Sequence, residues 1–143
     1  MSTCFFIGHR DAPESIYSKL EAVAENCIAE FGVTEFIVGH YGSFDHMAAR
    51  AVSTAKKKTH PEIMLTLLLP YLTNQSLPKG FDGSIYPEGL EFVPRRFSIL
   101  RANCIIVDHC DIVIAHVKHS FGGAYQCLEY ARKKEKIIIN ITE

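Results

Sequence analysis

The chain has 143 residues, of which 48% are hydrophobic and 22% charged, so it can bury an ordinary core and is expected to form one domain over residues 1–143. Its 15 lysines and arginines against 16 aspartates and glutamates give a net charge of −1, which argues against nucleic acid or an anionic membrane surface as a partner. No apolar run reaches the roughly 18 residues that a membrane helix needs, and no export signal is recognisable. We therefore expect a cytoplasmic protein that does not bind membranes.

Short apolar runs alternate with helical patterns along the chain, each run being typical of a strand buried on both faces. In chain order, the predicted elements are a strand at 3–7, a helix at 13–31, a strand at 35–39, a helix at 43–58, a strand at 63–69, a helix at 95–108, a strand at 112–116, a helix at 124–134 and a strand at 137–141. The lysine run 56–58 is interpreted as a solvated helix end, where cations are favoured.

Residues 71–94 interrupt this alternation. They hold three prolines and three glycines without a clear period, which indicates a lid, a binding loop or disorder. The remaining order predicts an α/β fold, namely a Rossmann-like three-layer α/β/α arrangement with a mainly parallel five-stranded sheet. In such sheets ligands bind outside the carboxyl ends of the strands.

Three strand ends are followed by glycine-bearing loops that lead into helices. Glycine lets a backbone approach a ligand closely, and the free N–H groups of a helix start attract anions. The candidate ligand-binding residues are Gly8, His9, Arg10, Gly39, Gly42, Ser43, Asp45, Ser120, Gly122 and Gly123. Arg10 suits a phosphate, whereas Asp45 suits either a helix cap or a ribose hydroxyl.

Other chemistries find less support. Neither G-x-G-x-x-G nor a Walker A motif occurs, so a standard dinucleotide or P-loop site is disfavoured and no cofactor is predicted. Seven histidines form no familiar zinc pattern, so no metal is expected. The odd number of cysteines and the absence of a CxxC pair indicate reduced core thiols; the five are Cys4, Cys27, Cys104, Cys110 and Cys127.

Four segments together resemble one family. The opening CFFIGHR ends in Gly8-His9-Arg10, as in the YpsA-like proteins, and residues 39–49 resemble that family's G-G-x-x-G-x-D-x-x-A-A stretch. Residues 107–115 resemble its V-D-x-S-D-x-x-I-A, and Gly122-Gly123 is followed by its Tyr-Ala pair. The resemblance implies membership of the SLOG superfamily, which includes DprA/Smf and the LOG phosphoribohydrolases, and it implies recognition of nucleotides at the glycine loops. By analogy with related folds, a homodimer is one candidate assembly.

The LOG motif P-G-G-x-G-T-x-x-E aligns with residues 121–129, where the two glycines and Glu129 match. Tyr125 and Gln126 replace the Gly-Thr pair, and none of Arg95, Arg96 and Arg101 sits in a motif that matches the upstream arginine of LOG enzymes. Asn103 fits the asparagine that precedes V-D in YpsA-like proteins.

The leading hypothesis is therefore a nucleotide-like small-molecule sensor or binding protein. The alternative is a LOG-like hydrolase of nucleoside 5'-monophosphates with Glu129 as acid/base, so whether the protein is an enzyme stays open. Binding of single-stranded DNA, as in DprA, is disfavoured because of the net charge and because no basic aromatic groove is recognisable.

Overall fold

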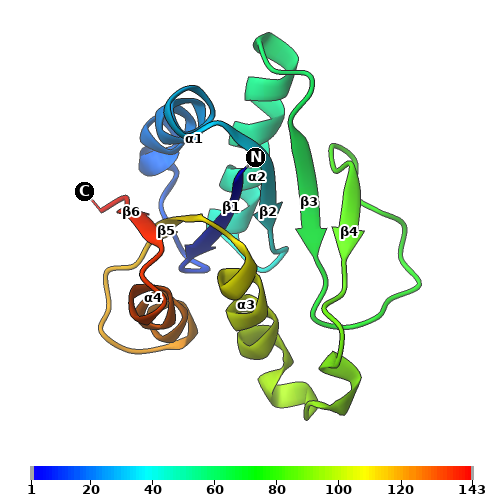
Figure 1. The fold of residues 1–143 in the computed structure, drawn as a ribbon. Helices are drawn as coiled ribbons and strands as arrows, with labels where there is room; N and C mark the ends of the chain where they lie inside the picture. Colours follow the sequence, from blue (N-terminus) through cyan, green and yellow to red (C-terminus); the bar gives the residue numbers. More distant parts are fainter. Residues whose placement is uncertain (1, 143) are drawn as a thin grey trace.

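A sheet of six parallel strands forms the centre of the computed structural model, which describes residues 2–142 (Figure 1). The strands are β1 (Ser2–Gly8), β2 (Val33–Val38), β3 (Met64–Leu68), β4 (Gly83–Ile85), β5 (Ile112–His116) and β6 (Ile137–Asn140). Their order across the sheet is β4-β3-β2-β1-β5-β6, and every neighbouring pair is parallel.

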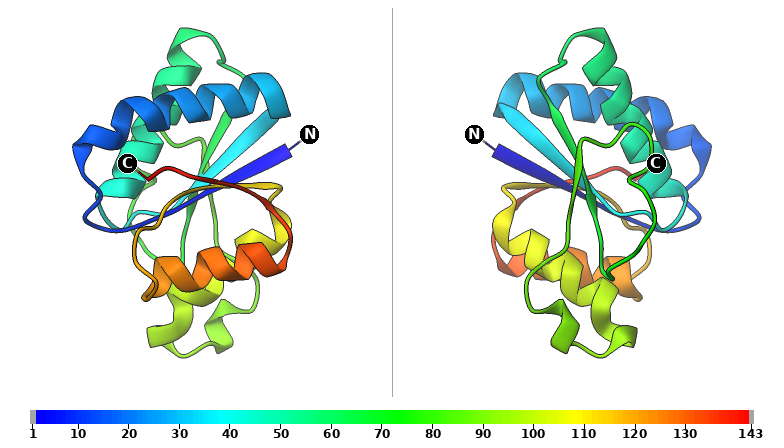
Figure 2. Two further views of the ribbon diagram at one scale, coloured as in Figure 1. Left: turned by 90° about the vertical axis from the view of Figure 1, so that its left-hand side faces the viewer. Right: turned by 90° about the vertical axis from the view of Figure 1, so that its right-hand side faces the viewer.

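Two helices cover each face of the sheet. The helices α1 (Tyr17–Phe31) and α2 (Ser43–Lys58) pack together on one face, and α3 (Ser98–His109) and α4 (Gly123–Lys133) pack together on the other (Figure 2). Single 3₁₀ turns lie at Glu14–Ile16, Leu90–Phe92 and Arg95–Phe97. The α/β class and the Rossmann-like three-layer arrangement predicted from the sequence are thus confirmed.

The continuous apolar runs are explained by burial on both faces. In β1, Cys4 and Phe6 point into the core beneath α1 and α2, whereas Phe5 and Ile7 point into the core beneath α3 and α4. All four side chains are at most 3% exposed. A strand between two helical layers needs apolar residues at every position, so the run does not alternate.

The predicted count of five strands is wrong, because β4 lies inside the segment 71–94. Asp82 accepts a hydrogen bond from the Leu65 N–H (2.8 Å) and forms an ion pair with Lys56 of α2. The Asp82 N–H in turn donates to the Leu65 carbonyl (2.8 Å). The side chain of Lys56 is only 18% exposed, so Lys56 is not the solvated cation that was expected.

The order of connections reverses between β1 and β5. From β1 the chain moves outward to β2 and β3, whereas β5 and β6 lie on the other side of β1. Gly8, the last residue of β1, is paired in register with His116, the last residue of β5. At such a reversal the loops after the two strands diverge to opposite faces and leave a crevice between them.

Candidate functional site

A cavity of about 400 Å³ opens at the carboxyl ends of β1, β2 and β3, next to α3 and the start of α4. Six of the ten predicted ligand-binding residues line it, and they come from all three glycine loops: Gly8, His9, Arg10, Gly39, Asp45 and Gly123. The structure therefore brings together loops that are more than a hundred residues apart in the sequence, as the strand-end pattern predicted.

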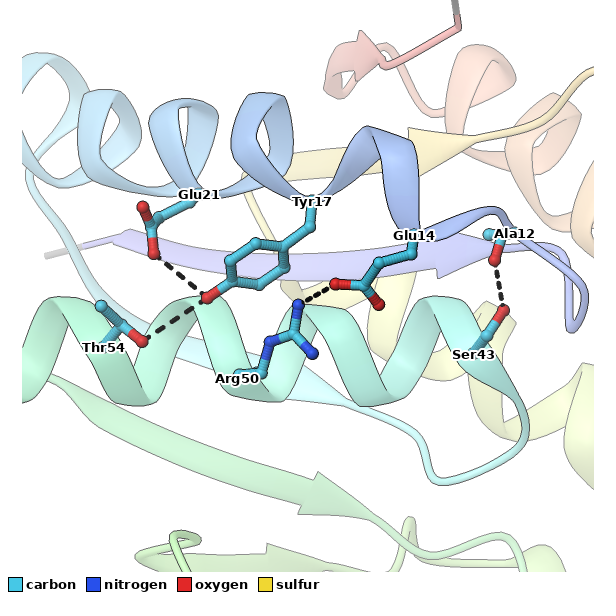
Figure 3. A network of polar contacts seen from close by, with 7 residues as sticks. All are labelled: Ala12, Glu14, Tyr17, Glu21, Ser43, Arg50 and Thr54. Carbon is cyan, nitrogen blue, oxygen red and sulfur yellow. Dashed lines mark hydrogen bonds and ion pairs between the residues drawn. The ribbon is translucent and has the colours of Figure 1, made fainter.

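Gly42 and Ser43 are used within the protein, between the loops that follow β1 and β2. The Ser43 N–H donates to the Arg10 carbonyl (2.9 Å), and the Ser43 hydroxyl lies 2.7 Å from the Ala12 carbonyl oxygen (Figure 3). Gly42 has φ +123°, and a Cβ there would lie 2.6 Å from Arg10 Cα. Both residues thus hold Arg10 at the cavity instead of lining it.

Side chains also join α1 and the turn before it to α2, further along the two helices. Arg50 of α2 forms an ion pair with Glu14 and lies over the Tyr17 ring (3.8 Å to the centroid). The Tyr17 hydroxyl also lies 3.5 Å from the hydroxyl oxygen of Thr54 in α2 (Figure 3). These contacts keep the start of α1, and with it the loop that carries Arg10, against α2.

Gly8 and Gly39 are required by packing. A Cβ on Gly8 would lie 2.3 Å from the ring of Phe44, which is 1% exposed, and a Cβ on Gly39 would lie 3.0 Å from Asp45 Oδ2. At these two positions, glycine makes room for neighbouring side chains of α2.

Asp45 lies in the first turn of α2 and lines the cavity. Its Oδ2 accepts a hydrogen bond from the Tyr41 N–H (3.0 Å), so it holds the loop before the helix. Burial raises the pKa of Asp45, against the opposing effects of the Tyr41 hydrogen bond and of the nearby His40 and His46. A carboxylate whose ionised form is disfavoured in this way is stabilised by a hydrogen-bond donor in the cavity.

His9 joins the loop after β1 to the loop after β5. The Nε2 atom of its ring accepts a hydrogen bond from the Lys118 backbone N–H (2.8 Å), and the His9 backbone N–H donates to the His116 carbonyl (3.3 Å). Burial lowers the pKa of His9, and the His119 ring 4.6 Å away lowers it further. The neutral ring with the proton on Nδ1 is therefore the form that suits this arrangement.

The start of α4 is open. Gly122 precedes the helix with φ +92° and no side chain caps it, and an added Cβ on Gly122 or Gly123 meets nothing within 4 Å. Gly123 and Ala124 line the cavity, whereas Ser120 and Gly122 are exposed beside it and are not among the lining residues. Uncapped N–H groups at a helix start, combined with the helix dipole, favour an anion.

Glu129, the candidate acid/base, lies elsewhere on α4. Its carboxylate forms an ion pair with Arg132 (2.9 Å), its side chain is 42% exposed, and it is not among the cavity-lining residues. The matching spacing of the LOG motif thus does not bring this carboxylate to the cavity.

Three further polar residues line the cavity although they were not among the predicted site residues: Tyr41, Arg96 and Asn103. Asn103 was marked by the family resemblance, and Arg96 was one of three arginines that the motifs left unassigned. Both come from the segment at and before α3, whose position against the sheet depends on tertiary packing.

A second cavity of about 440 Å³ adjoins the first and shares Tyr41, Leu68 and Pro70 with it. Cations lie over aromatic rings along both: Arg95 is 4.0 Å from the Tyr71 ring centroid, Arg96 is 4.8 Å from that of Phe97, and Arg10 is 5.9 Å from that of Tyr41. This basic aromatic edge was not predicted, because its residues come from four separate segments of the chain.

Among residues 2–142, no cluster of three or more histidine, cysteine, aspartate or glutamate side chains is suited to a metal ion. Over the same residues, none of the helices combines the length and the apolar character that crossing a bilayer would require.

No family model matches the chain, and no curated protein matches it. Solved structures that are similar to it in fold include two DNA processing proteins. DNA processing protein A (DprA) from Streptococcus pneumoniae superposes with a TM-score of 0.74 at 17% identity, over 100% of this chain and 51% of that one. DprA from Helicobacter pylori, studied for its single-stranded DNA binding mode, superposes with a TM-score of 0.70 at 18% identity, over 99% and 66%. The chain thus spans about half to two thirds of these proteins.

The expectation that excluded nucleic acid as a partner is overturned by this comparison. The H. pylori protein shares the fold and binds single-stranded DNA, so the fold does not exclude such a partner. Net charge is a sum over the whole molecule, whereas Arg10, Arg95 and Arg96 are gathered at one edge of it. What the comparison shows for this chain is its architecture: the protein has the Rossmann-like fold found in DprA.

Proposed function

We propose that the protein binds a nucleotide or a nucleotide derivative in the cavity at the carboxyl ends of β1, β2 and β3, and that it is a YpsA-like member of the SLOG superfamily. One observation carries the proposal. Three glycine loops, two arginines and the uncapped start of α4 converge on a single cavity of about 400 Å³, a volume within the range of small-molecule sites.

The chemistry of the lining residues suits the parts of a nucleotide. The N–H groups at Gly123, with Arg10 and Arg96 nearby, suit a phosphate. Asp45 suits a ribose hydroxyl, because an added donor would stabilise its ionised form. Apolar side chains form the remaining wall and suit the flat face of a base: Phe5, Ile7, Leu68, Ile99 and Leu100.

Binding without hydrolysis is the form of this proposal that the geometry favours. In the LOG-like alternative Glu129 is the acid/base and must lie within hydrogen-bond reach of the reacting atoms, but Glu129 is paired with Arg132 outside the cavity lining. Chromatography of a panel of nucleoside monophosphates is expected to detect no free base. Turnover by the wild type that is lost in Glu129→Gln would establish the hydrolase instead.

Calorimetric titration tests the binding itself, with nucleoside mono- and diphosphates and inorganic phosphate as probes. Arg10→Ala and Arg96→Ala should each weaken binding of a phosphorylated probe by about 1.5–3 kcal/mol, which is roughly a 10- to 150-fold increase in Kd. Lys57→Ala is the matched control, because Lys57 is an exposed cation at the far end of α2. Equal affinities of wild type and Arg10→Ala would remove Arg10 from the site, and the absence of binding to every probe would refute the proposal.

A second candidate function, binding of single-stranded nucleic acid, is favoured by the cation–aromatic pairs along the adjoining cavity. Bases stack on aromatic rings and phosphates pair with arginines in such proteins. Fluorescence anisotropy with labelled oligonucleotides tests it, with Arg95→Ala as the variant, because Arg95 lines only the second cavity. Weaker oligonucleotide binding with unchanged mononucleotide binding would support this function, and equal oligonucleotide binding by wild type and variant would refute it.

A further inference from the structure

Two cysteines face each other between α3 and α4. The Tyr130 hydroxyl of α4 donates to Asp108 Oδ1 of α3 (2.8 Å), which fixes how the helices lie against each other. Cys104 precedes Asp108 by four residues, and Cys127 precedes Tyr130 by three. Residues three or four apart share a helix face, so the two cysteines meet one turn before the Asp108–Tyr130 hydrogen bond. The effect that each thiol has on the pKa of the other agrees with this placement.

The two thiols differ in access and in acidity. Cys127 is 0% exposed, whereas Cys104 is partly exposed. The neighbouring Cys127 thiol lowers the pKa of Cys104 to about 7, against opposing effects of burial and of Asp108 and with a small further lowering by Arg101. A partly exposed thiol with a thiolate fraction at neutral pH, placed next to a second thiol, is the arrangement found in redox-sensitive cysteines.

We propose that Cys104 and Cys127 form a reversible redox pair, which a peroxide converts into a disulfide between α3 and α4. The proposal rests on the position of these side chains and is independent of what the cavity binds.

Atoms and electrons balance in two steps. The Cys104 thiolate attacks one oxygen of hydrogen peroxide, the O–O bond breaks, and the departing hydroxide takes up a proton to become water, which leaves Cys104 as a sulfenic acid. The Cys127 sulfur then attacks the Cys104 sulfur, the S–O bond breaks, and the hydroxide leaves as water with the Cys127 proton. Two thiols are oxidised and one peroxide is reduced to two waters.

The disulfide would connect two walls of the cavity. Leu100 and Asn103 of α3 and Gly123 and Ala124 of α4 all line it. An S–S bond of about 2.05 Å is shorter than any contact between two thiols, so forming it draws the two helices together. Oxidation would therefore change the spacing of the cavity walls.

The chain contains its own control. Cys4 of β1 and Cys27 of α1 also shift each other's pKa, but both are 0% exposed. A peroxide has no access to either sulfur, so this second pair should stay reduced under the conditions that oxidise the first.

The test treats the reduced full-length protein with a small excess of hydrogen peroxide, alkylates the remaining thiols after denaturation, and maps the peptides by mass spectrometry. We expect a linked Cys104–Cys127 peptide that has lost two hydrogen atoms, its loss on treatment with dithiothreitol, and alkylated Cys4 and Cys27. The linked peptide should be lost in Cys104→Ser and retained in Cys110→Ser.

The peptides of the wild type are sufficient to decide the outcome. The proposal can therefore be refuted even if a cysteine variant fails to fold. Full alkylation of Cys104 and Cys127 after peroxide treatment would overturn it. So would oxidation of Cys104 to the sulfinic acid without a linked peptide, or a Cys4–Cys27 link in its place.

Discussion

Gly8→Ala should destabilise the protein although it adds only a methyl group. The new Cβ would lie 2.3 Å from two carbons of the Phe44 ring, whereas carbon atoms in contact are about 3.5–4.0 Å apart. The ring would have to retreat by roughly 1.2–1.7 Å. It is 1% exposed, and Phe6 and His116 lie on either side with ring centroids 6.2 Å away, so it has no space to enter.

Overpacking of this kind costs about 1–3 kcal/mol, and the gain from a stiffer unfolded chain offsets only about 0.4–1 kcal/mol of that. We expect a net loss of about 1–2 kcal/mol and a Tm lower by about 3–6 °C in differential scanning calorimetry. Gly83→Ala is the control, because a Cβ there meets nothing within 4 Å. If Gly8→Ala melted at the same temperature as Gly83→Ala, the packing explanation for Gly8 would be refuted.

Three further predictions concern charged and titrating groups. Because burial and His119 lower the pKa of His9, its stabilising contribution should be complete above about pH 6.5 and be lost as the pH falls below that value. Between pH 7.5 and pH 5.5, a His9→Gln variant should therefore lose less free energy of unfolding than the wild type, as measured by chemical unfolding. An equal loss in the two proteins would contradict this. Because burial raises the pKa of Asp45, its ionised form costs stability at neutral pH. The Asp45→Asn variant should therefore have a higher Tm than the wild type at pH 7 and lose that advantage below about pH 4. A lower Tm of the variant at pH 7 would show that the carboxylate is needed for folding. Asp82→Ala should cost about 1–3 kcal/mol, because it leaves the Leu65 N–H and Lys56 without their shared acceptor; unchanged unfolding would mean that β4 is held by other contacts.

The sequence alone predicted those helices and strands whose hydrophobic pattern lies within a short stretch of the chain. Five strands were recognisable as short apolar runs, and β1 and β5 are buried on both faces. The helix α2 begins at Ser43 and ends at Lys58, as its apolar spacing and terminal lysines indicated. The strand β4 could not be predicted in this way. Gly83–Ile85 is three residues long and partly exposed, and its pairing depends on Asp82, which meets Lys56 only in the folded chain.

The same distinction applies to the site. Loops at strand ends are predictable because parallel strands all present their carboxyl ends to one edge, and this placed Gly8, Gly39 and Gly123 together. The role of an individual residue was not predictable. Gly8 lines the cavity, but the sequence did not reveal that its missing side chain also makes room for Phe44, while Arg96 reaches the cavity only because α3 packs across the sheet.

The hydrogen bonds that join the three loops have a thermodynamic consequence. Ser43 fixes the Arg10 backbone from one side, and His9 is fixed to Lys118 and His116 from the other. The rim of the cavity is therefore preorganised, and a ligand that enters it has little backbone entropy to remove. Differences in affinity between ligands should then report the contacts each one makes, and selectivity should reside in the side chains that line the cavity, above all Arg10 and Arg96.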